Sequence, residues 1–221
     1  MKDLHAVRGR YHIQRLVDEG EHQQQDFKFL ISDARKIARS VSAFANRDGG
    51  RLLIGVKDNG TIAGVRNEED VYVVEQAAQR YCRPAQDVKF EAFKVDAGVV
   101  VIVATIERTD CRPVRVLEQD GRQRAYYRVA DENIAAHPLL ERAWEMQSAD
   151  TMSAVMSLDG PTQSVLAAVD QAGDEGLEPE KVALQAHVSE RTAGDVLARM
   201  LALGVLELRY EHHRFVLHRT E

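Results

Sequence analysis

Arginine side chains gather in three parts of the sequence, and a guanidinium group can form two parallel hydrogen bonds to one phosphate. Arginines on strands and turns also commonly serve solubility alone. The residues therefore leave two interpretations open, a phosphate-binding surface and a solvated one. The three groups are Arg8, Arg10 and Arg15; Arg35, Lys36 and Arg39; and Arg108, Arg112, Arg115, Arg122, Arg124 and Arg128.

The segment Gly50–Asp58 superficially resembles the nucleotide-binding loop G-x-x-x-x-G-K-[ST]. Here Val56 separates Gly55 from Lys57, and an aspartate stands where the loop needs a magnesium-binding hydroxyl. The middle of the segment is an apolar strand pattern instead of a loop of exposed amides. The sequence therefore gives little support to ATP binding.

Length and composition permit one large domain or two small ones. At 221 residues, with 44% hydrophobic and 29% charged residues, the chain is ordinary for a globular protein. Its longest apolar run, Val99–Ile106, is far shorter than the roughly 18 residues that cross a bilayer. The two cysteines, Cys82 and Cys111, lie outside any C-x-x-C pattern. With no apolar signal-peptide core near Met1, we expect a cytoplasmic protein without membrane contact or structural metal.

Negative charge is concentrated towards the C-terminus. The net charge is −6, and the residues from Val155 onward hold 6 Lys/Arg and 11 Asp/Glu, a balance of −5. The preceding part is therefore close to neutral. Serines and small residues mark the change in composition between positions 148 and 160. We predict two domains, residues 1–147 and 161–221, joined by a linker of residues 148–160.

Helical and extended patterns are mixed in the first part of the chain. Because they do not alternate strictly, they predict an α+β fold, a mixed sheet with flanking helices. Ser32 is expected to cap the second helix. Helices are expected at 11–19, 33–47, 68–81 and 137–146, and extended segments at 26–30, 51–56, 61–65, 88–95, 98–107, 113–117 and 123–129.

The C-terminal part shows the element order of a small winged-helix domain. Helices are expected at 162–172, 178–186 and 189–203, followed by a hairpin at 205–217. Ser189 is placed to cap the third helix. That helix carries Arg191 and Arg199 as candidate nucleic-acid contacts, but also Glu190 and Asp195. An acidic segment matches phosphate poorly, so contact with DNA and contact with protein both stay open.

Asn46 is a polar residue near the expected end of a helix whose other face is apolar. It stands beside the turn Gly49-Gly50, where glycine supplies the positive φ that a tight turn needs. Its amide can cap the local backbone or contact a ligand, and capping is the favoured role.

Several short motifs follow one another in a fixed order between Gly20 and Val65. In these motifs the chain resembles the nucleic-acid-binding domain shared by Schlafen and AlbA-type proteins, over about Leu16–Trp144. The motifs are Gly20-Glu21, Asp26-Phe27-Lys28, Ser42-Ala43-Phe44-Ala45-Asn46 with Gly49-Gly50, Ile54-Gly55-Val56-Lys57-Asp58-Asn59-Gly60 and Ile62-x-Gly64, and later Tyr126-x-Arg128 with Asn133.

The resemblance also implies a candidate metal site. In some eukaryotic Schlafen proteins, an acidic trio at the positions that match Glu21, Asp26 and Asp58 forms a metal-dependent RNase site. Carboxylates of this kind bind Mg²⁺ or Mn²⁺, which positions water and stabilises the leaving oxygen. Asp26 departs from the family's E-F-K glutamate and has a shorter reach. The alternative is a set of solvated surface acids.

Together these inferences predict a nucleic-acid-binding protein, a bacterial transcriptional regulator acting as a homodimer on two-fold sites. The alternatives are a divalent-metal-dependent nuclease that uses the acidic trio, and a dimeric protein-interaction module. Mg²⁺ or Mn²⁺ is the one cofactor suggested. The sequence does not separate DNA from RNA. The expected nucleic-acid contacts are Arg35, Lys36, Arg39, Arg112, Arg115, Arg124, Arg128, Arg191 and Arg199.

Overall fold

The computed structural model describes residues 4–65, 69–149 and 158–220. The chain divides into two compact units, Met1–Ala136 and His137–Glu221. None of the helices in the described residues combines the length and the apolar composition that a bilayer span requires.

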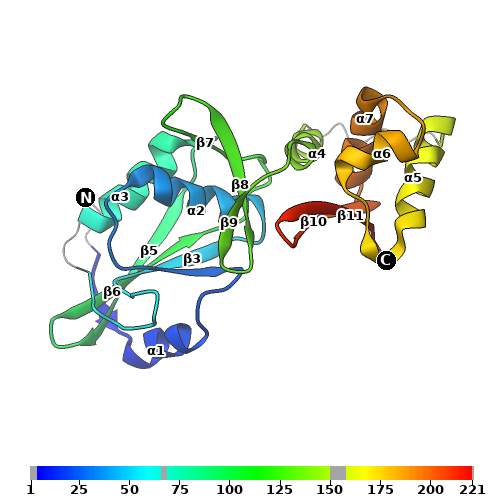
Figure 1. Ribbon diagram of the computed structural model, residues 1–221. Helices are drawn as coiled ribbons and strands as arrows, with labels where there is room; N and C mark the ends of the chain where they lie inside the picture. Colours follow the sequence, from blue (N-terminus) through cyan, green and yellow to red (C-terminus); the bar gives the residue numbers. More distant parts are fainter. Residues whose placement is uncertain (1–3, 66–68, 150–157, 221) are drawn as a thin grey trace. The chain divides into compact units, whose positions relative to one another are not determined.

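A five-stranded mixed sheet forms the centre of the N-terminal unit (Figure 1). The two outer strand pairs are parallel, and the two inner pairs are antiparallel. A mixed sheet with helices beside it confirms the predicted α+β class. The strands lie in the order β1 (Val7–Arg8), β5 (Val88–Asp96), β6 (Val99–Ile106), β3 (Gly50–Ile54) and β2 (Gln25–Lys28).

Helices cover both faces of this sheet because its strands alternate apolar residues between the faces. Along β3, Leu53 belongs to the apolar cluster that includes Ile13, whereas Leu52 and Ile54 belong to the cluster that includes Phe44. The first cluster lies under α1, and the second under α2 and α3 (Figure 1). These helices are α1 (Arg10–Asp18), α2 (Ala34–Asn46) and α3 (Glu69–Gln76), which continues as the π-helix η1 (Ala77–Tyr81).

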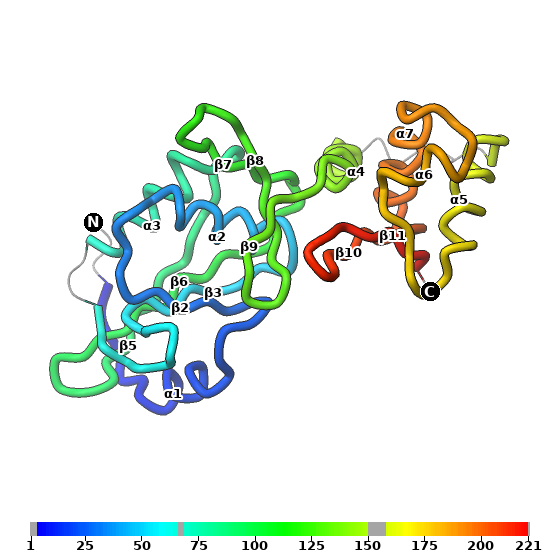
Figure 2. Tube along the Cα trace, viewed as in Figure 1, coloured from blue at the N-terminus to red at the C-terminus, as the bar shows by residue number. Residues whose placement is uncertain are grey.

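A second, four-stranded antiparallel sheet packs on α2 from the other side (Figure 2). Val116 and Tyr126 of this sheet share one apolar cluster with Phe44 of α2. Strands that follow α2 by about 40 to 90 positions therefore cover the side of α2 that faces away from the five-stranded sheet. The strands lie in the order β4 (Cys82–Arg83), β7 (Arg115–Leu117), β8 (Gln123–Val129) and β9 (Glu132–Ala135).

Two local predictions for the N-terminal unit are wrong. The segment 61–65 is no strand and forms only an isolated bridge between Ile62 and Val56. The chain folds back on itself there, since the Gly64 N–H donates to the Gly55 carbonyl at 2.9 Å, and a Cβ on Gly55 would lie 2.7 Å from the Gly64 backbone. Helix α2 is capped by Asp33, not by Ser32, because the Asp33 carboxylate accepts hydrogen bonds from two N–H groups of the first turn.

The C-terminal unit is a bundle of helices with a two-stranded ribbon. Its apolar core contains Leu139 and Ala143 of α4, together with Leu197 of α7. The unit therefore begins at His137, whereas the sequence predicted a domain from residue 161. Most of the predicted linker lies outside the described residues. The elements are α4 (Pro138–Ser148), α5 (Gly160–Ala172), the short η3 (Gly173–Glu175), α6 (Pro179–Gln185), α7 (Glu190–Ala202), β10 (Leu206–Glu211) and β11 (Arg214–Arg219).

The start of α7 follows the sequence prediction. Ser189 Oγ accepts a hydrogen bond from the Thr192 N–H at 3.1 Å, as an N-cap serine does. Between α5 and α6, Leu177 forms an isolated antiparallel β-bridge with Leu217 of the ribbon. The ribbon is thereby fixed to the helices.

Candidate functional site

Strand β2 places the second of the predicted acidic residues inside the protein. Asp26 is 4% exposed, and its carboxylate lies 2.7 Å from Lys28 Nζ and 3.4 Å from Arg128 Nη2. The Ser40 hydroxyl of α2 donates a further hydrogen bond to it at 3.4 Å. Two cations of the chain itself therefore neutralise this carboxylate.

Glu21 joins Asp26 to form an acid pair. Burial, and after it the hydrogen bond with Asp26, raise the pKa of Glu21 from 4.5 to about 6. Burial also acts to raise the pKa of Asp26, but the hydrogen bond with Glu21 and the charges of Lys28 and Arg128 outweigh it and lower that pKa. Glu21 therefore takes up a proton before Asp26 does, and it then donates its hydrogen bond to the carboxylate.

Arg128 is a core residue, and the prediction that it contacts nucleic acid is wrong. Its side chain is 1% exposed and lies over the ring of Phe44, with 5.3 Å from the guanidinium carbon to the ring centre. Its nitrogens donate to Asn133 Oδ1 at 3.0 Å and to the Gln25 carbonyl at 3.2 Å. A guanidinium this deeply buried needs a paired charge, and Asp26 supplies it.

Asp58 does not complete a metal site with the acid pair. Within the part of the chain that the structure describes, no group of three or more His, Cys, Asp and Glu side chains is placed to hold a metal ion. Asp58 is exposed and lines a shallow pocket of about 360 Å³ with Lys28, Lys57 and Leu30. Because Asp26 is already ion-paired, the residues present do not fit the Mg²⁺ or Mn²⁺ site that the resemblance implied.

Asn46 neither caps its own helix nor faces solvent, so both predicted roles are wrong. The side chain is 1% exposed. Its amide nitrogen donates to the carbonyls of Val114 and Tyr126 at 2.9 and 2.8 Å, and its oxygen accepts from the Val114 N–H at 2.7 Å. Ser42, one turn earlier, bonds to the same two residues. Asn46 therefore fastens α2 to the second sheet.

Three of the predicted phosphate-binding arginines are engaged within the protein. Arg39 forms two hydrogen bonds with the buried Glu118, at 2.9 and 2.7 Å, and the bonds from Arg39 lower the pKa of that carboxyl. Arg124 lies 3.2 Å from Asp120. Arg112 is half-buried, donates to a backbone carbonyl of α2, and has a pKa lowered by burial.

The other cations of this region gather around Tyr81. The guanidinium of Arg35 lies over the Tyr81 ring, 4.7 Å from its centre, and Lys36 follows on the same helix. Arg80 precedes Tyr81, and Arg83 follows it on β4, directly opposite Arg115 of β7. Among the described residues, Lys36, Arg80 and Arg83 are exposed and form no ion pair. We call Arg35, Lys36, Arg80, Arg83 and Arg115 the basic surface.

Arg80 and Arg83 were not among the sequence candidates. They stand at the end of a predicted helix, with no motif around them. Only the pairing of β4 with β7 brings Arg83 beside Arg115, and that pairing joins segments about 32 residues apart. The two arginines at positions 80 and 83 are a weak sequence signal for a basic surface. This signal can be interpreted only when the strand that pairs with β4 is known.

In the C-terminal unit, Arg191 and Arg199 lie exposed on α7, and their contact with nucleic acid stays a prediction. Acidic residues accompany them. Asp195, between the two arginines, is ion-paired with Arg142 of α4 and has a pKa lowered by that hydrogen bond. The exposed face of α7 is therefore of mixed charge.

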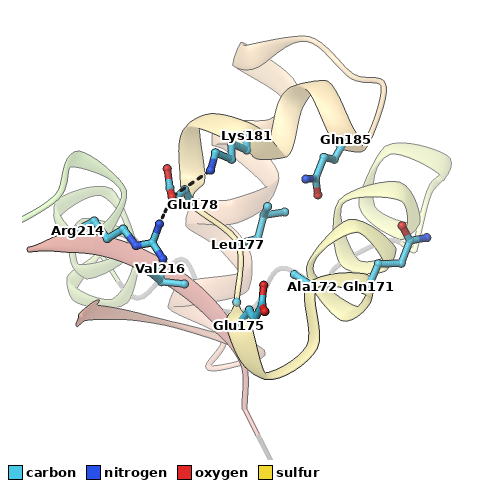
Figure 3. A pocket seen from close by; sticks show the side chains of 10 residues that line it. Gln171, Ala172, Glu175, Leu177, Glu178, Lys181, Gln185, Arg214 and Val216 are labelled. Atoms are coloured by element: carbon cyan, nitrogen blue, oxygen red, sulfur yellow. Dashed lines mark hydrogen bonds and ion pairs between the residues drawn. The ribbon is translucent and has the colours of Figure 1, made fainter. Parts of the chain in front are cut away.

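A pocket of about 430 Å³ opens beside the ribbon of this unit (Figure 3). Its most prominent charged group is Glu178, whose carboxylate accepts hydrogen bonds from Lys181 at 3.1 Å and from Arg214 at 2.6 Å. Leu177 lies between these charges and Gln185 (Figure 3). Because the main charges of the pocket neutralise one another, they point to no ionic ligand.

Comparison with known proteins gives one strong match. Residues 21–137, more than half of the chain, match the model of the Schlafen AlbA_2 family. No curated protein matches. Among solved structures, the DIP2311 protein from Corynebacterium diphtheriae is 19% identical with a TM-score of 0.46, over 88% of this chain and 34% of that one, so this chain spans about a third of its length.

The N-terminal domain of a RecG-related protein from Nitrosomonas europaea is 17% identical with a TM-score of 0.43, over 60% of this chain and 97% of that domain. Both structural likenesses are too distant to carry an argument about function. The family match is different in kind, because it covers the five-stranded sheet from β2 onward, the second sheet and the motifs on them. The chain belongs to the Schlafen AlbA_2 family.

Proposed function

We propose that this protein binds nucleic acid through the basic surface of its N-terminal unit and acts as a bacterial transcriptional regulator in the cytoplasm. The observation that carries the proposal is the set of exposed cations around Tyr81, in which Lys36, Arg80 and Arg83 form no ion pair in the described residues. Unpaired cations on one surface release counterions when they contact phosphates, and this release drives binding. Membership of the Schlafen AlbA_2 family supports the proposal.

The C-terminal unit has a winged-helix architecture in this proposal. The order α5, bridge, α6, α7 and ribbon, with Leu177 bridging Leu217, supports the assignment. Its α7 carries Arg191 and Arg199 beside Glu190 and Asp195, so it contributes less phosphate affinity than the basic surface. Its role is to select a DNA site or a protein partner.

A homodimer is part of the same proposal, because two copies of the basic surface match a site with two-fold symmetry. Light scattering on the full chain, with and without nucleic acid, measures the state directly. A monomer in both conditions would remove this part of the proposal and leave nucleic-acid binding intact.

The test of binding uses labelled duplex DNA and RNA with the full chain in a salt series. Lys36→Gln/Arg83→Gln should weaken binding across sequences and reduce the slope of log K against log salt by about 2, since each lost phosphate contact contributes about 0.9. The matched control is Lys89→Gln/Arg124→Gln, which removes two cations already paired with Glu107 and Asp120. Equal slopes in the two double variants would count against the basic surface.

The same experiment with added Mn²⁺ tests the nuclease alternative. The acid pair gives that alternative no support, because Lys28 and Arg128 already neutralise Asp26. We expect intact substrate after incubation. Metal-dependent cleavage that disappears in Asp58→Asn would reverse the choice between the two functions.

A further inference from the structure

A second concentration of positive charge lies at the β1 edge of the five-stranded sheet. There, a pocket of about 440 Å³ opens where β1, the first turn of α1 and the end of β5 meet. Its volume falls within the range of pockets that hold small organic ligands. Its lining includes Arg8, Arg10, Tyr11, Lys94 and Asp96.

The cations of this pocket outnumber its acids. Arg8 and Lys94 are direct partners in the parallel pairing of β1 with β5. Like charges at facing positions of neighbouring strands repel each other. Both side chains are exposed, and neither forms an ion pair among the described residues. Asp96 pairs with Arg10 at 3.8 Å, which leaves the two facing cations without a counter-charge. A bound anion would relieve their repulsion.

Tyr11 gives the same pocket an aromatic surface. Its side chain is 91% exposed, the largest exposure among the large hydrophobic residues of the described chain. A ring in this position contributes almost no buried area to the fold, so packing does not explain why an aromatic residue stands here. Both faces of such a ring are available for stacking, and every nucleic-acid base has a π-face that can stack on it.

From these observations we infer that the pocket binds one nucleoside phosphate, with its base on Tyr11 and its phosphate between Arg8 and Lys94. This nucleoside phosphate is part of a single-stranded nucleic acid or is a free nucleotide, because both present the same base and phosphate. A duplex does not fit, because its bases are stacked on one another and cannot stack on Tyr11. Binding of a single-stranded nucleic acid in this pocket rests on the proposed function. It extends that function by naming single strands as a class of ligand.

The experiment measures fluorescence anisotropy of labelled single strands of about 12 nucleotides, DNA and RNA, and of a duplex of similar length, with the full chain. Tyr11→Ala should weaken single-strand binding about tenfold, whereas Tyr11→Phe keeps the ring and should weaken it less than about twofold. Duplex binding should be the same in all three proteins. Because these variants change the ring and leave every charge in place, they measure the contribution of stacking separately from that of charge.

The charge arm uses Arg8→Gln/Lys94→Gln. The slope of log K against log salt for single strands should fall by about 0.7, since the two cations share one phosphate and each phosphate contact contributes about 0.7. The matched control is Lys89→Gln/Arg122→Gln, which removes one cation of β5 and one from the turn before β8, both outside the pocket. Uridine and thymidine monophosphates serve as competitors, and displacement of the labelled strand by either one assigns the pocket to free nucleotides as well.

The failures are distinguishable. A wild type that binds no nucleic acid and no nucleotide overturns both this inference and the proposed function. Binding that is lost in Lys36→Gln/Arg83→Gln but unchanged in Tyr11→Ala and Arg8→Gln/Lys94→Gln overturns the pocket alone. A change in self-association of Tyr11→Ala, seen by light scattering without any change in strand binding, would make this surface a protein contact and also overturns the inference.

Discussion

The two units of the protein differ in what they bury. The N-terminal unit buries charged and amide side chains between its two sheets, among them Asp26, Asn46 and Arg128. In the C-terminal unit, the buried polar side chains within the described residues are Thr162 and His218, and the core is aliphatic. Its arginine–carboxylate pairs, such as the one between Arg219 and Asp170, lie at the surface.

This difference separates residues that specify the fold from residues that are free to bind. A buried polar group is tolerated only beside its partner, so Asn46 and Arg128 determine which distant segments lie against α2. Both residues lie in the motifs by which the family is recognised. Arg80 and Arg83, which lie outside the motifs, are exposed. In this chain, Asn46 and Arg128 therefore belong to a structural network, and the proposed binding residues lie outside the motifs.

The strongest test of this comparison replaces the buried arginine. Arg128→Met leaves Asp26 with one cation instead of two and removes the bonds to Asn133 and Gln25. We expect the free energy of unfolding to fall by about 3 to 5 kcal/mol. Denaturant unfolding followed by circular dichroism measures the change, and Trp144, the single tryptophan, reports the C-terminal unit by its fluorescence.

The matched control is Arg124→Met, which removes an exposed arginine from the same strand. Its expected effect is below about 0.5 kcal/mol. If both variants lose the same stability, Arg128 does not act as a structural residue, and the distinction between buried and exposed cations fails.

The next test compares shape-conserving changes in the two cores. Asn46→Leu keeps the volume but leaves the Val114 N–H and the Tyr126 carbonyl without their partners, so we expect a loss of about 3 kcal/mol. In the C-terminal core, Leu197→Met replaces one flexible apolar side chain by another and should cost less than about 1.5 kcal/mol. Equal losses, measured by the same unfolding curves, would show that the two cores tolerate change alike.

The sequence predicted the class and most elements of the fold because these depend on local patterns. The apolar run at β3, the cap at Ser189 and the helix that becomes α2 follow from periodicity and capping chemistry. The strand predicted at 61–65 is wrong because Gly55 and Gly64 let the chain fold back on itself with the two backbones in close contact. No local pattern in the sequence records that contact.

The site was less predictable, because it depends on contacts between distant segments. Arginines in a strand-rich stretch look alike in sequence, yet Arg128 is buried by Phe44 and Asp26, whereas Arg124 is exposed. Asn46 has its partners 68 and 80 positions away. Neither the sign of a charge nor its spacing reveals such a partner.

A smaller effect tests the acid pair through pH. The pKa of Glu21 is raised to about 6 in the folded protein, so its contribution to stability is full below about pH 4.5 and is lost as the pH rises through 6. A shift of this size corresponds to about 2 kcal/mol, and partial exposure of Glu21 reduces the expected loss to about 1 kcal/mol.

Glu21→Gln imitates the protonated form at every pH, so its stability relative to the wild type should increase by about 1 kcal/mol between pH 4.5 and pH 7. Unfolding curves at a series of pH values measure this difference. A flat difference for Glu21→Gln would mean that Glu21 and Asp26 do not share a proton.

The smallest expected effect is that of a divalent ion, and it decides whether the acid pair belongs to the buried network or to a reactive site. A site for Mn²⁺ or Mg²⁺ would stabilise the fold by about 2.7 kcal/mol at a hundred times the dissociation constant of the ion. Because Lys28 and Arg128 already neutralise Asp26, a further positive charge beside them would be repelled. We therefore expect the melting temperature to be the same with EDTA, Mg²⁺ and Mn²⁺, in the wild type and in Asp58→Asn. An increase of the melting temperature with Mn²⁺ in the wild type but not in Asp58→Asn would show that the acidic side chains are open to solvent and bind metal. The distinction between a buried polar network and an exposed binding surface would then be wrong.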